Sequence, residues 1–218
     1  MRKITRIGRG IIVLSTAMLF FSSCIELTEK VTVNPDGSGK IELKLDMGSL
    51  ASALNSQNTG FDVSLIEKIR KTVREAPDIL KDQKGIRDVI SSSDDKNGVF
   101  IIRFCFDRSA NLNKAVYLLM GAEKQGIFPD LYKITRHKVR KKDLGPFVQK
   151  AMKNVKSSGF NDMFYSVIYY NNIIELPSAV KSVKNIKSKT EGDRTVSTRL
   201  TFENMIKGHF SSGNLIRY

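Results

Sequence analysis

Residues 25–47 have the sequence IELTEKVTVNPDGSGKIELKLDM, and this segment indicates the architecture of the whole chain. Apolar side chains alternate with polar ones on both sides of NPDGSG, a stretch rich in turn-forming residues. The alternating apolar residues are Ile25, Leu27, Val31, Val33, Ile41, Leu43 and Leu45. Alternation with a period of two around such a turn is typical of a β-hairpin. DGSG lacks the further oxygen ligands and the closing Glu of an EF-hand, so we expect a plain turn and no metal.

Other segments extend this pattern along the chain. GIRDVISSSDDKNGVFIIRFCFD (residues 85–107) predicts a hairpin that turns at Asn97-Gly98, and TEGDR predicts another turn between residues 179–189 and 194–202. Helices are expected over residues 61–78, 109–126 and 145–155. Strands therefore dominate both ends, with helices in the middle. We predict an α+β fold, with an antiparallel sheet built from hairpins and helices packed on one face.

The remaining segments are assigned by the same signals. LYKITRHKVRKKDLG (131–145) is expected to form a basic strand, and DMFYSVIYYNNIIELP (162–177) a long aromatic strand. The tail, residues 203–218, is expected to hold a helical turn followed by loosely ordered chain. With no internal repeat and no low-complexity linker, residues 24–218 are predicted to form one domain. Residues 154–159 are the alternative position for a boundary.

The chain is strongly basic, with 36 Lys and Arg against 22 Asp and Glu and a formal net charge of +14. Such a balance favours anionic partners, among them anionic lipid, lipopolysaccharide and acidic polymers. A candidate patch for an anionic surface lies in KITRHKVRKK; it comprises Lys133, Arg136, Lys138, Arg140, Lys141 and Lys142. A second basic set is Lys181, Lys184, Lys187 and Lys189. The alternative is a solvated strand and a lysine-rich edge that discourages edge-to-edge association.

Residues that would indicate catalysis are sparse. The sequence contains no Gly-x-Ser-x-Gly elbow, phosphate loop or dinucleotide fingerprint. The two histidines, His137 and His209, have no second His at a metal-ligand spacing. Cys105 lies in an apolar run and is expected to be a structural thiol. Asp94 and Asp95 are adjacent, so on a strand they would point to opposite faces. We expect no enzyme activity, no metal and no cofactor; a hydrolase whose acids converge only in space is the alternative.

The first 24 residues, MRKITRIGRGIIVLSTAMLFFSSC, have the layout of a secretory signal peptide. Four basic residues precede an apolar run from Ile11 to Phe21, which is shorter than the about 20 residues that a membrane-spanning helix needs. FFSSC resembles the lipobox of bacterial lipoproteins, with Phe21 where Leu is commonest. That resemblance implies cleavage between Ser23 and Cys24, removal of residues 1–23, and Cys24 as the lipid carrier.

A lipidated cysteine followed by a strand, a DGSG turn and a second strand resembles a group of small envelope lipoproteins without an assigned activity. The resemblance implies a bacterial cell-envelope protein held in a membrane by its N-terminal lipid. Ile25 replaces the Asp that signals inner-membrane retention in enteric bacteria, which favours the outer membrane. We expect a non-catalytic protein whose basic domain binds an envelope component, such as anionic lipid or lipopolysaccharide, or an envelope protein. Nucleic acid is not an expected partner, and a carrier of an apolar ligand in a cleft between sheet and helices is the alternative.

Intact-mass spectrometry of the membrane-extracted protein tests the leader assignment. The expected mass lacks residues 1–23 and gains two or three acyl chains, and Cys24→Ser abolishes that gain. An unmodified mature chain or an uncut leader would contradict the assignment.

Overall fold

The computed structural model describes residues 25–48, 63–121, 129–155 and 165–218. The predicted signal peptide, its cleavage site at Ser23 and the lipid carrier Cys24 lie outside these residues. Among the helices in the described ranges, none combines the length and the apolar character needed to cross a membrane.

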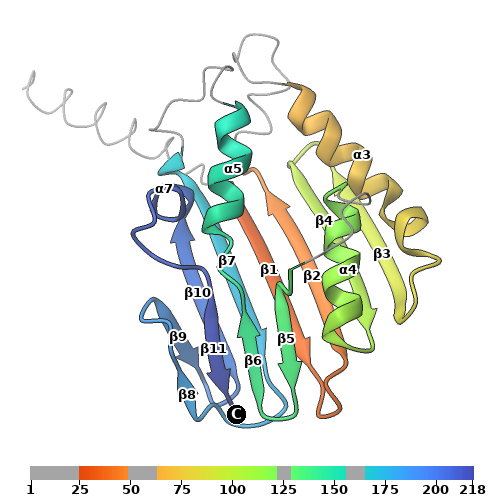
Figure 1. Ribbon diagram of the computed structural model, residues 1–218. Helices are drawn as coiled ribbons and strands as arrows, with labels where there is room; N and C mark the ends of the chain where they lie inside the picture. The colour runs from red at the N-terminus through yellow and green to blue at the C-terminus, as the bar shows by residue number, and fades with distance from the viewer. Residues whose placement is uncertain (1–24, 49–62, 122–128, 156–164) are drawn as a thin grey trace, which may run out of the picture.

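A large sheet of seven strands forms the back of the molecule in Figure 1. Its first hairpin is β1 (Ile25–Val33) with β2 (Gly39–Asp46), in the predicted place. The strand order is β3 (Ile86–Asp94), β4 (Val99–Phe106), β2, β1, β7 (Ile168–Glu175), β10 (Thr195–Thr201) and β9 (Ser188–Glu191). All neighbours are antiparallel except β1 and β7, which are parallel. The parallel pair joins the N-terminal hairpins to the C-terminal strands.

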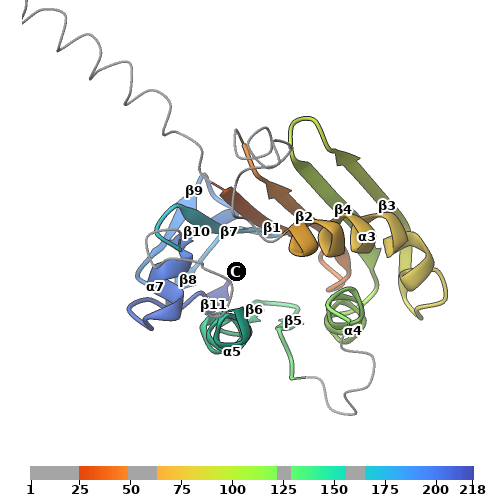
Figure 2. The same cartoon turned by 90° about the horizontal axis from the view of Figure 1, so that it is seen from above.

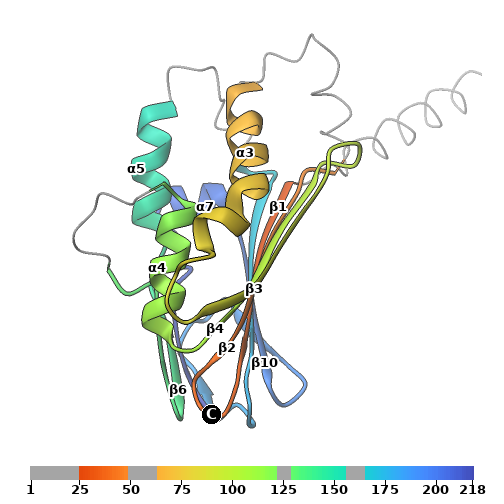
Figure 3. The same cartoon turned by 90° about the vertical axis from the view of Figure 1, so that its right-hand side faces the viewer.

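Helices cover one face of this sheet, as Figures 2 and 3 show. They are α3 (Val63–Leu80), α4 (Ser109–Leu119), α5 (Gly145–Val155) and the short α7 (Phe202–Ile206). The α+β fold with hairpins and with helices on one sheet face is confirmed.

A second sheet of four strands lies on the same side of the large sheet as the helices (Figures 2 and 3). Its order is β5 (Tyr132–Thr135), β6 (Lys138–Lys141), β11 (Asn214–Arg217) and β8 (Ser182–Val183). The predicted single basic strand over residues 131–145 is therefore wrong. The chain instead folds back at Arg136 and His137, a turn without Gly or Pro to announce it. The tail is also more ordered than predicted, because β11 pairs on both sides and Ile216 is fully buried.

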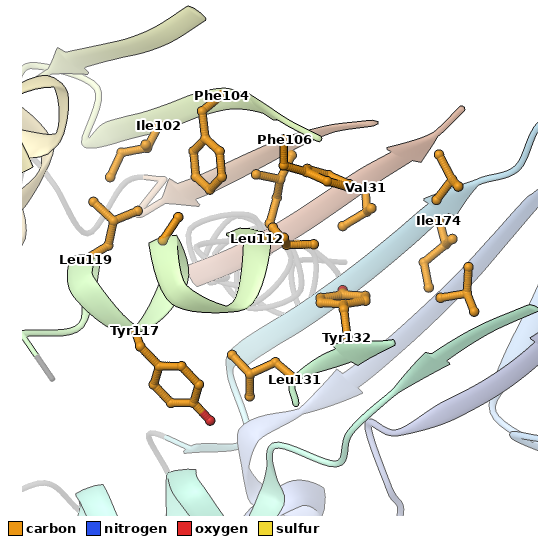
Figure 4. Close-up of a cluster of buried hydrophobic side chains, with 14 of the residues drawn as sticks. Val31, Ile102, Phe104, Phe106, Leu112, Tyr117, Leu119, Leu131, Tyr132 and Ile174 are labelled. Atoms are coloured by element: carbon orange, nitrogen blue, oxygen red, sulfur yellow. The ribbon is translucent and has the colours of Figure 1, made fainter. Parts of the chain in front are cut away.

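The hydrophobic core fills the space between the large sheet and the second layer (Figure 4). Phe104 and Phe106 of β4 and Leu112 of α4 are fully buried there. Tyr170, in the predicted aromatic strand, is 2% exposed and packs in a second buried cluster with Leu200 and Met205. This packing does not favour the alternative of an apolar-ligand cleft between sheet and helices, which the sequence would line with the aromatic segment Phe164–Tyr170; Phe164 itself lies outside the described residues.

The side chain of Asn113 connects α4 to the second sheet. It hydrogen-bonds the backbone of the edge strand β5, as a neighbouring strand would. Its Oδ1 accepts a hydrogen bond from the Tyr132 backbone N–H at 2.8 Å, and its Nδ2 donates to the Tyr132 carbonyl at 2.8 Å. Asn113 is 4% exposed, so both backbone groups of Tyr132 depend on this side chain rather than on water. The edge of the small sheet is therefore bound to the helix layer.

Replacing Asn113 tests this connection. Asn113→Ala leaves a buried N–H and a buried carbonyl without a partner, and should lower the free energy of unfolding by about 3 kcal/mol. Urea denaturation followed by circular dichroism measures it. The control is Lys114→Ala, the exposed neighbour on the same helix, which should change stability by less than about 0.5 kcal/mol. Equal effects of the two substitutions would refute the connecting role.

Candidate anion-binding face and its buried support

The exposure of β6 alternates with the period of a strand. Lys138 and Arg140 are exposed, whereas Val139 and Lys141 are buried. Because successive side chains on a strand point to opposite faces, two of the predicted patch residues lie outward and one lies inward.

The outward side of the small sheet carries four basic side chains, which we call the cationic face: Lys133, Lys138, Arg140 and Arg217. Lys133 lies opposite Arg140 in the β5–β6 register, and Lys138 lies opposite Arg217 in the β6–β11 register. The four strands of this sheet contain no Asp or Glu. Within the described part of the chain, no acidic side chain forms an ion pair with any of the four. In Figure 1 this face is turned towards the viewer, and none of the described helices lies over it.

The two cross-strand pairs of the cationic face are like-charged. Side chains directly opposite on neighbouring strands have Cβ atoms about 5 Å apart, and like charges at that separation are destabilising. Folding alone therefore does not favour this arrangement.

The outward face of the large sheet provides a contrast within the same molecule. There Lys30 pairs with Glu175 at 2.7 Å, and Arg199 with Glu26 at 2.5 Å. Arg103 likewise pairs with Glu42 on the neighbouring strand. Three basic residues of that sheet face are thus paired with carboxylates of the protein, and the four of the cationic face are not.

Lys141 is the residue of the predicted patch that the structure removes from the surface. Its side chain is 1% exposed, and its Nζ lies 3.3 Å from Oε2 of Glu29 on β1. The same Nζ lies 5.3 Å from the ring centroids of both Tyr132 and Tyr170. We call Glu29 and Lys141 the buried pair; it spans the core from the large sheet to the small one. The patch prediction fails here because Lys141 has the same strand parity as buried Val139.

The surroundings of the buried pair satisfy its polar atoms. The Tyr170 hydroxyl donates to Glu29 Oε2, and Asn172 Nδ2 donates to the Tyr132 hydroxyl at 2.9 Å and to the Glu29 carbonyl at 3.3 Å. Burial and, secondly, the Glu29 charge raise the pKa values of Tyr132 and Tyr170 well above the ordinary value, so both hydroxyls are neutral. The cluster is a closed polar network that positions strands.

A signal for this cluster is present in the sequence. The apolar positions of β1 are odd-numbered, and Glu29 stands in that series between Leu27 and Val31. A charged residue in the apolar series of one strand requires an opposite charge in the apolar series of another. Lys141 meets that requirement, but only the fold shows that β6 faces β1.

The other predicted site residues lie apart from the buried pair. Arg136 is exposed in the β5–β6 turn, and Lys142 lies 5.5 Å from the Phe147 ring centroid. In the second basic set, Lys181 and Lys184 are exposed beside β8. The Nζ of Lys187 lies 3.8 Å from the Phe210 ring centroid.

The two acids and the cysteine that the sequence analysis weighed as catalytic residues have surroundings typical of structural residues. Asp94 accepts hydrogen bonds from Asn97 at the tip of the second hairpin, and Asp95 pairs with Arg70 at 2.8 Å. Burial raises the pKa of the Cys105 thiol, which disfavours the reactive thiolate. In the described residues no group of three or more His, Cys, Asp or Glu is arranged to hold a metal ion.

Comparison with known proteins adds little. No known protein family matches the chain, and no curated protein matches it. A solved structure that resembles it is the folded domain of LppM from Mycobacterium tuberculosis, determined by NMR. That match has a TM-score of 0.45 and 15% sequence identity, and it covers 89% of this chain and 90% of the other. Similarity at this level does not assign a family.

Neighbouring residues of β6 give a direct test of the inward and outward assignment. Lys141→Gln leaves the Glu29 carboxylate buried without its cation and should lower the free energy of unfolding by about 3–5 kcal/mol. Arg140→Gln removes an exposed charge and should change it by less than about 0.5 kcal/mol. Urea denaturation of the two variants measures the difference. Similar losses would place both side chains in the same environment and contradict the assignment.

Proposed function

We propose that the chain is a bacterial envelope lipoprotein, held in a membrane by lipid on Cys24, whose cationic face binds an anionic component of the envelope without catalysing a reaction. The leader and FFSSC support the anchor. The cationic face supports the binding role. Ile25 after the lipid carrier favours the outer membrane.

The observation that carries the binding role is the pair of like-charged contacts, Lys133 with Arg140 and Lys138 with Arg217. An anionic surface laid on this face would relieve their repulsion and would need no rearrangement of the strands. Each basic residue near an anionic membrane surface contributes about 1 kcal/mol. Three or four of these residues acting together give a useful affinity. High salt should weaken that affinity, because it screens the charges.

The position of the face relative to the anchor supports binding away from the anchoring membrane. Cys24 immediately precedes β1, which begins at the upper end of Figure 1. The β5–β6 turn, which adjoins Lys138, lies at the opposite end, beside the β1–β2 turn. A nine-residue strand spans about 26 Å, whereas charges in physiological salt are screened beyond about 8 Å. The turn end of the cationic face would therefore meet anionic material other than the anchoring bilayer.

A capture assay in trans tests this function. The acylated protein is reconstituted in neutral phosphatidylcholine vesicles and mixed with fluorescent vesicles that contain phosphatidylglycerol or lipopolysaccharide. We expect capture at low salt. Capture should be lost in 0.5 M NaCl, because the Debye length there is about 3–5 Å and the charges are screened. The triple variant Lys133→Gln, Lys138→Gln and Arg140→Gln should weaken capture about 100-fold.

The matched control removes two Lys and one Arg elsewhere, at Lys68, Lys71 and Arg74 on the exposed side of α3. Changing these three to Gln should leave capture within about twofold, because the net charge falls equally but the cationic face is intact. Equal losses of capture in both triple variants would show that capture depends on net charge and not on the cationic face. No capture by the unmodified protein would contradict the proposed function and leave a protein partner as the remaining candidate.

A further inference from the structure

A surface hollow of about 440 Å³ lies at the other side of the molecule from β3, where β9 and β10 meet α7 and the segment that follows it. Its lining includes three basic side chains, Lys187, Lys189 and Arg199, and two aromatic rings, Tyr169 and Phe210. Small-molecule sites have volumes of about 300–1,000 Å³. The hollow is therefore large enough for a small charged ligand with a substituent.

The aromatic rings hold two of the cations in place. Lys187 Nζ lies 3.8 Å from the Phe210 ring centroid, and Arg199 Cζ lies 4.2 Å from that of Tyr169. Contacts of this kind attract a cation to the ring face and restrict a side chain that would otherwise sample many rotamers. The two charges are thus positioned before any ligand arrives, which reduces the entropy lost on binding.

Arg199 retains donors for a ligand. Its Nη2 donates to Glu26 Oε1 at 2.5 Å. A guanidinium carries five N–H donors in a planar fork, so this one partner leaves others directed elsewhere. Among the described residues that line the hollow, the acid is Glu191, and it already accepts a hydrogen bond from Ser197. With Glu26 counted beside Glu191, three cations face two carboxylates, so the hollow keeps a net positive charge.

We propose that this hollow binds a phosphate ester, with the phosphate between Lys187 and Arg199 and its substituent along the wall formed by Leu200 and Asn204. A guanidinium fork matches the oxygens of phosphate in two parallel hydrogen bonds, and an ammonium adds a point charge. Lys189, exposed on β9, adds a third cation. Inorganic phosphate alone would leave most of the volume empty, and for this reason the ligand class is an ester.

The position of the hollow is compatible with two sources of the phosphate ester. Glu26, the partner of Arg199, is the second residue after Cys24, so Arg199 lies at the end of the sheet where the proposed anchor begins. A phospholipid headgroup of the anchoring bilayer and a soluble phosphate ester both have the required chemistry. The inference goes beyond the proposed function and uses none of the residues of the cationic face.

Calorimetric titration of the full-length protein in a neutral detergent tests the site. The probes are glycerol phosphate and the short-chain lipid dihexanoyl phosphatidylglycerol, at low ionic strength. The double variant Lys187→Gln and Arg199→Gln should raise the dissociation constant about tenfold or more, since it removes two charge-assisted contacts. The matched control, Lys184→Gln and Arg194→Gln, removes one Lys and one Arg that lie outside the hollow and should leave the constant unchanged.

Thermal unfolding of each variant shows whether the fold is retained. Arg199→Lys, which keeps the charge and loses the fork, provides a milder variant and should weaken binding by a smaller factor. Equal affinity for both probes supports a soluble ester, and binding of the lipid alone supports a headgroup. Binding of neither probe, or an equal loss in the control variant, would overturn the proposal. The triple variant of the cationic face should bind both probes normally, so failure of the proposed function remains distinguishable from failure here.

Discussion

The ion pair between Glu29 and Lys141 is the constraint on which the rest of the structure depends. It crosses the core from β1 to β6, the strands at the centres of the two layers. A buried charge without its partner costs several kcal/mol, so arrangements that bring these two residues together are favoured. A strand shifted by one residue would turn Lys141 to solvent and Arg140 into the core. The pair therefore fixes the register of the small sheet as well as its position.

The distribution of positive charge follows from that register. With Lys141 directed inward, its neighbours on β6 are directed outward, opposite Lys133 and Arg217, and they form a face without acids. On the outward face of the large sheet, Lys30, Arg103 and Arg199 each pair with a Glu of another strand, whereas the small sheet offers its cations no acid. At the edge of the large sheet, aromatic rings rather than acids hold Lys187 and one side of Arg199. Basic side chains with few acids among them thus gather at the cationic face and at the edge of the large sheet.

Local patterns predicted much of the fold. The alternation and turns of residues 25–47 and 85–107 correctly predicted hairpins, and helical spacing correctly predicted α3. The parallel pairing of β1 with β7 joins residues about 140 positions apart, for which no local pattern exists. The small sheet was missed because β8 has two residues and β11 lies in a tail with glycine and serine before it. The cationic face was predicted in part, since composition shows where cations are abundant but only pairing shows that Lys141 is buried. The hollow depends on side chains from separate elements, and the second basic set of the sequence indicated only its Lys187 and Lys189.

A double-mutant cycle on the buried pair tests the central claim most directly. The free energy of unfolding is measured for the unmodified protein, Glu29→Gln, Lys141→Met and the double variant. The account predicts that the double variant is more stable than the sum of the single losses implies, by at least about 1–3 kcal/mol, because neither partner is then left charged and alone in the core. Losses that add without coupling would contradict the claim that this pair joins the two sheets.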